Sequence, residues 1–181
     1  MLNFRDDPNA FRAFITEHQD RVFNLVLNKV QQAEDAEEIT QDVFIDVFRK
    51  PEAFRGESAV NTWLYRIAIN KCIDHLRKQE SRGRWKLTRL FSTGNETTEP
   101  KDLLHPGILH ENREKAAFLF KAMKQLPDKQ HTAWVLSEME SMSYNEISEV
   151  MNLSISSVES LLFRARQNLK KILSGMYPGE K

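Results

Sequence analysis

Residues 143–171 read SYNEISEVMNLSISSVESLLFRARQNLKK, and this stretch predicts two short helices separated by a turn. Two patterns, Ser143-x-x-Glu146 and Ser156-x-x-Glu159, match the capping box, in which a serine and a glutamate satisfy free N–H groups at a helix start. Apolar residues at helical spacing follow each pattern. The stretch therefore predicts a helix–turn–helix, a layout in which the second helix can enter the DNA major groove.

The second predicted helix, residues 157–173, has an apolar side and a polar side. Its predicted buried stripe is Val158, Leu162, Ala165 and Leu169. On the other side, an exposed phenylalanine beside an arginine favours contact with thymine methyl groups and base edges. The candidate residues for contact with duplex DNA are Ser157, Glu159, Ser160, Phe163, Arg164 and Gln167. At the edge of that side lie two cations within reach of phosphates, Arg166 and Lys170.

Two features of this helix have a second interpretation. Basic residues near a helix C-terminus also occur in helices that bind nothing, because cations favour that end of the helix dipole. Glu159 either completes the second capping box or accepts a hydrogen bond from a cytosine amino group. The pattern alone leaves both questions open.

The rest of the chain also has helical periodicity, which predicts an all-α fold. Before residue 80, periodic segments begin near residues 8, 20, 34 and 60, and Pro51 ends the third of them. Residues 91–107 (FSTGNETTEPKDLLHPG) combine turn-forming and polar residues, as flexible linkers do. Further helices are predicted from residue 111 to 126 and from 128 to 139. We predict two small domains, an N-terminal helical bundle and a C-terminal helix–turn–helix, with a flexible linker between them: residues 1–80, 111–181 and 81–110, respectively.

The predicted helix over residues 34–50 combines a buried stripe with an acidic face. The predicted stripe is Ala36, Ile39, Val43 and Val47, with Phe44 and Phe48 beside it. Its outward face has i, i+3, i+4 and i+7 spacing and comprises Glu38, Gln41, Asp42 and Ile45. Charged faces are usually only solvated. An apolar residue among acids is instead typical of a protein-binding patch, and its partner should be a basic surface, plausibly a helix.

The predicted helix over residues 60–78 and the loop before it combine aromatic rings, an amide and cations. Such groups can hold unstacked bases while cations follow the phosphates. The candidate residues for contact with single-stranded DNA are Phe54, Arg55, Asn61, Trp63, Arg66 and Asn70. A stripe of Thr62, Arg66 and Asn70 follows one side of the helix at i, i+4 and i+8. For Trp63 and Tyr65 the alternative interpretation is that each ring belongs to the core.

Composition excludes several classes of function. The 181 residues contain one cysteine, so neither a disulfide framework nor a CxxC zinc site is expected. No apolar run approaches the ~20 residues of a membrane span, and the N-terminus does not resemble a signal peptide. The five histidines are scattered, and no glycine-rich phosphate loop occurs. We therefore expect a cytoplasmic protein without membrane insertion that is not an enzyme and has no metal site and no cofactor.

Three segments, in this order, resemble bacterial sigma factors of the extracytoplasmic-function (ECF) group. AEDAEEITQDVFIDVFRK, residues 33–50, resembles the family's helix that binds the clamp helices of the largest subunit of RNA polymerase. FRGESAVNTWLYRIAINKCIDHLRK, residues 54–78, resembles its promoter-melting and minus-ten segment. LPDKQHTAWVLSEMESMSYNEISEVMNLSISSVESLLFRARQNLKK, residues 126–171, resembles its minus-thirty-five helix–turn–helix.

This resemblance implies a transcription initiation factor that binds core RNA polymerase, directs it to promoter DNA and helps to melt the minus-ten region. It implies that Glu38, Gln41 and Asp42 match the polymerase-docking positions. It assigns capture of a flipped minus-ten base to the loop over residues 54–61 with Arg66 and Asn70, and minus-thirty-five recognition to Ser160, Phe163 and Arg164. It also allows for an anti-sigma factor as a partner.

The sequence departs from the family's pattern at Glu159 and Leu161, where relatives often have basic residues, and the preferred minus-thirty-five sequence therefore stays open. Two other classes compete with this interpretation. A helix–turn–helix regulator with a helical sensing domain would bind duplex DNA tightly by itself. A helical adaptor without a DNA role would tolerate changes at Phe163 and Arg164.

Overall fold

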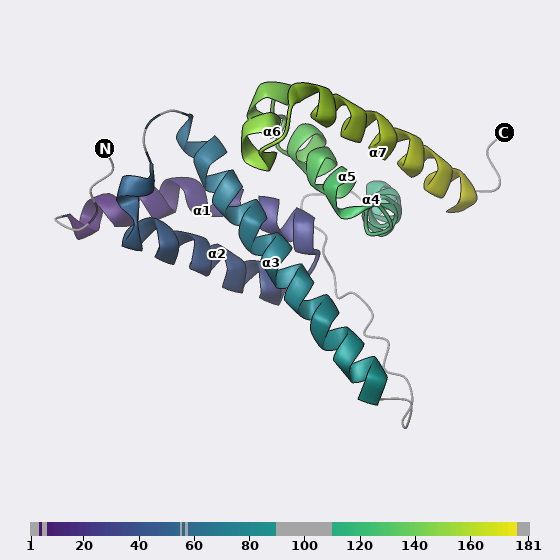
Figure 1. Cartoon of the computed structure of the whole chain (residues 1–181), viewed down its shortest axis with the longest axis horizontal. Helices are drawn as coiled ribbons and strands as arrows, with labels where there is room; N and C mark the ends of the chain where they lie inside the picture. Colours follow the sequence, from purple (N-terminus) through teal and green to yellow (C-terminus); the bar gives the residue numbers. More distant parts are fainter. Residues whose placement is uncertain (1–3, 5–6, 55, 57, 90–109, 177–181) are drawn as a thin grey trace. The chain divides into compact units, whose positions relative to one another are not determined.

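The computed structural model of the chain describes residues 4, 7–54, 56, 58–89 and 110–176, and every regular element in those residues is helical. The chain divides into two compact units, Met1–Asp102 and Leu103–Lys181. Their boundary falls in residues 90–109, which lie outside the described residues and which include the predicted linker stretch 91–107. The prediction of an all-α fold in two helical regions is confirmed (Figure 1).

The first unit begins with helix α1 (Pro8–Val30), which is continuous where the sequence predicted two segments. Asp7 caps it, since its carboxylate accepts hydrogen bonds from the N–H groups of Asn9 and Ala10 at 2.9 and 3.1 Å. The prediction of a second start near residue 20 was wrong. No proline or glycine interrupts residues 9–30, and the buried His18, whose ring lies 4.5 Å from that of Phe14, continues the inner stripe.

Helix α2 (Ala33–Arg49) packs against α1 and against the later helix α3, and these two helices also contact each other. Its predicted inner stripe is confirmed, because Ala36, Ile39, Val43 and Val47 are buried. Pro51 ends α2 as predicted and opens a single 3₁₀ turn, η1 (Pro51–Ala53). Phe48, which the sequence placed beside the inner stripe, is instead 43% exposed.

Helix α3 (Val60–Arg89) completes the bundle and runs well beyond its predicted end at residue 78. Leu64, Ala68 and Cys72 are buried on its inner face. The residues after 78 are mostly good helix formers without proline, so the helix continues into the first part of the predicted linker. Its C-terminal part projects past α1 and α2 (Figure 1).

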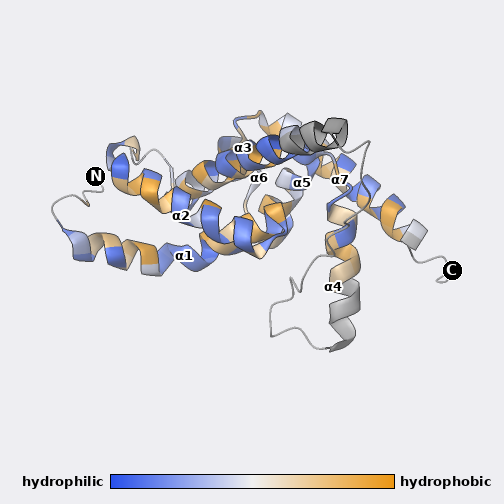
Figure 2. Ribbon diagram, turned by 90° about the horizontal axis from the view of Figure 1, so that it is seen from below, coloured by the Kyte–Doolittle hydropathy of each residue, from blue (hydrophilic) through white to orange (hydrophobic). Residues whose placement is uncertain are grey.

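The second unit contains α4 (His110–Met123), α5 (Asp128–Trp134), the π-helix η2 (Val135–Met139), α6 (Tyr144–Met151) and α7 (Ile155–Met176). The helix predicted over residues 128–139 therefore changes from α to π geometry at its midpoint. Met123, Leu136, Ile147 and Leu162 are the largest fully buried side chains of this unit. Hydrophobic and hydrophilic residues alternate along the helices of both units in Figure 2, as expected for helices with one buried side.

Candidate functional site

The helix–turn–helix of the second unit consists of α6 and α7. The capping box predicted at the start of α6 is confirmed: the Ser143 hydroxyl accepts from the Glu146 N–H at 3.4 Å, and the Ser143 N–H donates to the Glu146 carboxylate at 2.8 Å. The Ser143 hydroxyl, first, and the Ser143 N–H both donate hydrogen bonds to the Glu146 carboxylate, and these bonds lower the pKa of Glu146. Asn152 then ends α6 with a left-handed backbone, φ 50°, which turns the chain toward α7.

The start of α7 differs from the prediction. The helix begins at Ile155, and Ser154 caps it: the Ser154 hydroxyl accepts from the Ser157 N–H at 3.3 Å, and its carbonyl accepts from the Val158 N–H at 3.1 Å. The predicted start at residue 157 and the capping box of Ser156 and Glu159 were therefore wrong. Ser154 lies one residue before the helix, and its side chain accepts from a free N–H group of the first turn. Glu159 is the fifth residue of α7 and is exposed, so its capping interpretation is eliminated.

The two sides of α7 agree with the prediction. The inner stripe of Val158, Leu162, Ala165 and Leu169 is buried. Phe163 is 64% exposed, which is the largest exposed fraction among the exposed large hydrophobic residues of the described chain. The other candidate residues on this side are exposed, apart from the half-buried Ser157: Glu159, Ser160, Arg164 and Gln167. The structure thus brings the candidate duplex-contacting residues together on one accessible face.

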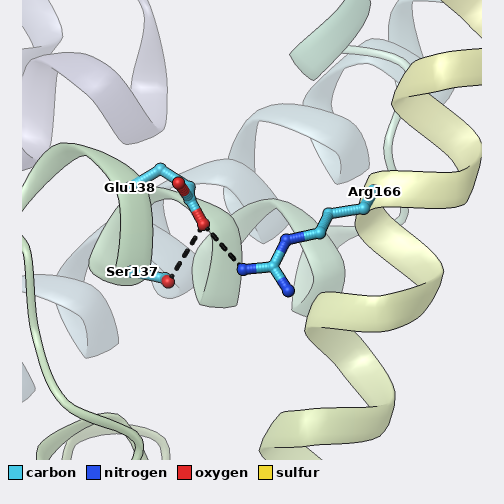
Figure 3. A network of polar contacts seen from close by, with 3 residues as sticks. All are labelled: Ser137, Glu138 and Arg166. Carbon is cyan, nitrogen blue, oxygen red and sulfur yellow. Dashed lines mark hydrogen bonds and ion pairs between the residues drawn. The ribbon is translucent and has the colours of Figure 1, made fainter.

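Arg166, which the sequence placed in reach of phosphates, has a partner within the protein. Its Nη2 lies 3.0 Å from Oε1 of Glu138 in η2 (Figure 3). Nothing in the local sequence indicates this pair, because the two residues lie 28 positions apart.

The candidate docking residues of α2 share an exposed face, which we call the docking face: Glu38, Gln41, Asp42 and Ile45. Ile45 is 45% exposed. Lys71 of α3 borders this face, with its Nζ 2.7 Å from the Asp46 carboxylate and 3.9 Å from that of Asp42. The face therefore remains acidic toward solvent while one cation ties it to α3.

A groove of about 620 Å³ lies next to the docking face, between α1 and α2. Its lining comprises Phe11, Ile15, Gln19, Thr40, Gln41, Phe44, Ile45, Phe48 and Arg49. Gln41 and Ile45 thus belong to both surfaces. The rings of Phe11 and Phe48 lie 4.9 Å apart at its edge. Sequence reasoning missed Phe48, although Gln41, Ile45 and Phe48 follow i, i+4, i+7 spacing and indicate one common face.

The candidate residues for single-stranded DNA are only partly brought to the surface. Arg66 and Asn70 are exposed on α3, and Asn61 is half-buried at its start. Arg55 lies outside the described residues. In the loop before α3, Gly56 has φ +73°, a left-handed conformation that favours glycine.

Trp63 and Tyr65 belong to the core. Trp63 is 4% and Tyr65 is 5% exposed, which agrees with the alternative interpretation that each is a core ring. The predicted direct contact between Trp63 and an unstacked base is corrected, because the ring is covered by the bundle. Phe54, which is half-buried, lies with its ring 5.2 Å from that of Trp63. Thr62 is also buried, so only Arg66 and Asn70 of the predicted stripe face outward.

Two features are absent from the described residues. Among them, no group of three histidine, cysteine, aspartate or glutamate side chains could hold a metal ion. No described helix combines the length and the apolar character that a membrane crossing requires.

Comparison with known proteins assigns a family to each unit. Residues 14–82 match the family described as Sigma-70 region 2, and residues 119–169 match Sigma-70, region 4. The first match contains the docking face and the α3 candidates, and the second contains the helix–turn–helix.

Similarity to individual proteins extends over nearly the whole chain. The RNA polymerase sigma-H factor of Pseudomonas aeruginosa is 34% identical over 173 residues, which cover 93% of this chain and 89% of that protein. The ECF RNA polymerase sigma-E factor of Escherichia coli K12 is 31% identical, with 90% and 86% covered.

Solved structures share the fold. The sigma factor RpoE of Bartonella quintana, solved with the anti-sigma factor NepR, aligns with a TM-score of 0.69 at 22% identity and covers 91% of this chain and 96% of its own. CnrH, solved with the cytosolic domain of CnrY, aligns with a TM-score of 0.66 at 20% identity, with 93% and 90% covered. With sigma-70 regions 2 and 4 both present in chain order, and with close to whole-length similarity to curated relatives, the chain belongs to the ECF group of bacterial RNA polymerase sigma factors, which initiate transcription at promoters.

Proposed function

We propose that this sigma factor uses three separate surfaces: α2 for core polymerase, the start of α3 for the minus-ten strand and the outer side of α7 for the minus-thirty-five duplex. The observation that carries the proposal is the same on α2 and α7. On both helices the apolar stripe is buried, and the candidate residues face solvent apart from the half-buried Ser157.

On α2, the docking face would bind the clamp helices of the largest polymerase subunit. The exposed Ile45 lies among acids, and it continues into a groove that Phe48 and Phe11 border. A basic helix carrying one or two apolar residues would satisfy both parts of this surface, because the acids attract it and the groove removes apolar area from water.

On α3, Arg66 and Asn70 would contact the displaced non-template strand together with Phe54 and Asn61. Arg55 stays a candidate on the sequence alone. An amide and a guanidinium can read the edge of an unstacked base and follow its phosphates. Trp63 would act indirectly here, since its buried ring supports the ring of Phe54.

On α7, Ser157, Ser160, Phe163, Arg164 and Gln167 would enter the major groove of the minus-thirty-five element. Arg164 is suited to a guanine edge or a phosphate, and Phe163 to a thymine methyl group or a sugar. With its capping alternative eliminated, Glu159 would accept from a cytosine amino group.

This proposal has consequences for the domain bounds, the location and the partners of the chain. The functional domains would be residues 1–80 and 111–181, and the length of α3 suggests that the connecting linker starts after residue 89. A chain that binds core polymerase and promoter DNA would act in the cytoplasm, and it would need no catalytic groups of its own. The structural neighbours were solved with partner proteins, one of them an anti-sigma factor, and we propose an anti-sigma factor that covers the docking face of this chain.

Run-off transcription with purified core polymerase and a promoter library tests the proposal directly. We expect specific transcripts only when the chain, core polymerase and a subset of promoters are combined. The rival regulator would instead bind duplex DNA tightly without polymerase, and the rival adaptor would select no promoters at all.

A further inference from the structure

Arg166 joins α7 to η2 of the second unit through its guanidinium. Its Nη2 donates to Oε1 of Glu138 in η2 at 3.0 Å. The Ser137 hydroxyl donates to the same Oε1 at 3.2 Å, which holds the carboxylate in place (Figure 3). The hydrogen bond with Glu138, first, and the nearby Tyr144 side chain raise the pKa of Arg166. One side chain in the middle of α7 is therefore bonded to the end of η2.

The short connection between η2 and α6 shows what the contact between Arg166 and Glu138 can hold in place. The chain leaves the π-helix, passes Ser141 with φ 54° and reaches the capping box at Ser143 within a few residues. The main attachment of α6 in this unit is apolar, through the buried Ile147 and Val150. Apolar burial has no preferred direction, whereas a charge-assisted hydrogen bond does. The ion pair is thus suited to fix the orientation of α7 against the elements before it.

The position of Arg166 on α7 separates it from the duplex-facing residues. It follows the buried Ala165 directly and lies four residues after the buried Leu162. With about 3.6 residues per turn, it falls on the flank of the helix, away from the centre of the side that carries Arg164 and Gln167. The flank faces η2, as the bond to Glu138 shows.

We propose that Arg166 is an intramolecular clasp with Glu138, a positioning residue that sets how α7 is presented to the minus-thirty-five duplex, and that it is not primarily a phosphate contact. This inference rests on the proposed role of α7 in duplex recognition. Nothing in the family resemblance or in the comparisons assigns such a role to either residue.

The clasp should influence binding more than folding. The side chains of Arg166 and Glu138 are 51% and 39% exposed. Ion pairs this exposed contribute little to the free energy of unfolding because solvent screens them. Removing the clasp should therefore leave the melting temperature nearly unchanged while α7 samples orientations that fit the duplex less well.

The test uses the full chain assembled with core polymerase and a promoter selected from a library by the wild-type holoenzyme. Binding constants are measured over a series of salt concentrations for Arg166→Ala, for Glu138→Ala and for the charge-exchanged pair Glu138→Arg with Arg166→Glu. Arg164→Ala serves as the reference for a residue on the duplex-facing side. Circular dichroism and the melting temperature of each variant verify folding.

For the clasp we expect both single variants to weaken binding by up to about fivefold, the upper end for an exposed ion pair. The slope of log affinity against log salt should stay that of the wild type. The charge-exchanged variant should recover wild-type affinity and base preference, because it rebuilds the pair with the opposite polarity.

Two results would overturn the inference while duplex recognition by α7 stands. If Arg166 contacts a phosphate, Arg166→Ala should lower the slope of log affinity against log salt by about 0.9. The charge-exchanged variant should then fail to recover affinity, because it puts a carboxylate near the phosphate. Wild-type binding by both single variants, with a loss in Arg164→Ala, would show that the pair has no role. Wild-type binding by Arg164→Ala as well would instead remove α7 from the duplex, and the inference with it.

Discussion

Reversing the charge of Asp42 is the sharpest test of the docking face. Two unit charges about 4 Å apart interact by about 1 kcal/mol in water and about 4 kcal/mol at the effective dielectric of a protein surface. Asp42→Lys replaces an attraction to a basic partner by a repulsion. A loss of about 2–4 kcal/mol, or about 30-fold to 1000-fold in affinity for core polymerase, follows for an interface between these limits.

The fold should tolerate this substitution. A lysine at position 42 would lie four residues from both Glu38 and Asp46, at the spacing of favourable helical ion pairs. Lys71 would keep its closer partner, the Asp46 carboxylate at 2.7 Å. The melting temperature should therefore change little, and a loss of binding would report the interface itself.

Ile45 supplies a second, uncharged probe of the same face. Complete burial of an isoleucine side chain contributes about 1.5–3 kcal/mol. Because Ile45 is 45% exposed, roughly half of this, about 0.7–1.5 kcal/mol, remains to be gained on docking. Ile45→Ala should weaken core binding about threefold to tenfold, without the salt dependence of the Asp42 effect.

Fluorescence anisotropy of labelled chain titrated with core polymerase at several salt concentrations measures both effects. Glu17→Lys is the matched control, because Glu17 is an exposed acid of α1 that does not line the groove. It makes the same change in net charge and should bind core polymerase nearly as the wild type does. Equal affinities for Asp42→Lys, Ile45→Ala and the wild type would refute the assignment of α2.

Five further substitutions test the other surfaces and the helices that present them. Glu159→Gln should change preference at one base pair of the minus-thirty-five element by about 1–3 kcal/mol, measured by promoter selection, and an unchanged preference would eliminate base reading. Ser154→Ala should lower the free energy of unfolding by about 1 kcal/mol in thermal denaturation, whereas Ser156→Ala should be nearly silent because Ser154 caps α7. Asn70→Ala should slow promoter melting, followed by permanganate footprinting, without loss of stability. Trp63→Ala should instead destabilise the fold by about 3–5 kcal/mol because its ring is buried, and equal stability of these two variants would contradict this division of roles.

Periodicity predicted the packing of this chain well because burial is decided by helix geometry. The inner stripe of α7 and that of α2 follow from spacing alone, and both are buried as predicted. The exposed side of each helix then follows as its complement. The candidate residues on α2 and α7 could therefore be found from the sequence.

Helix ends and contacts between residues far apart in the sequence could not be predicted from periodicity. Ser154, Ser156 and Ser157 all suit a cap, and only the observed turn after Asn152 decides that Ser154 reaches the free N–H groups. The π turn of η2 has no comparable sequence signal, and the Arg166–Glu138 bond depends on where that turn puts Glu138. The predicted base contact of Trp63 failed for another reason: in the sequence, an aromatic residue suits a stacking surface and a core equally well.

The charge distribution predicts that this chain binds promoter DNA weakly without polymerase. The whole chain has 26 basic and 26 acidic residues, so no excess of cations draws it to DNA. On the described part of α7, Arg166 is engaged by Glu138, which leaves Arg164, Lys170 and Lys171 facing solvent along with the acidic Glu159. Even if each of those cations met a phosphate, the salt slope would be only about −2.7, at about 0.9 per contact. We expect the chain alone to bind duplex DNA weakly with a slope no steeper than this, and the proposed docking of α2 on polymerase would supply the remaining affinity.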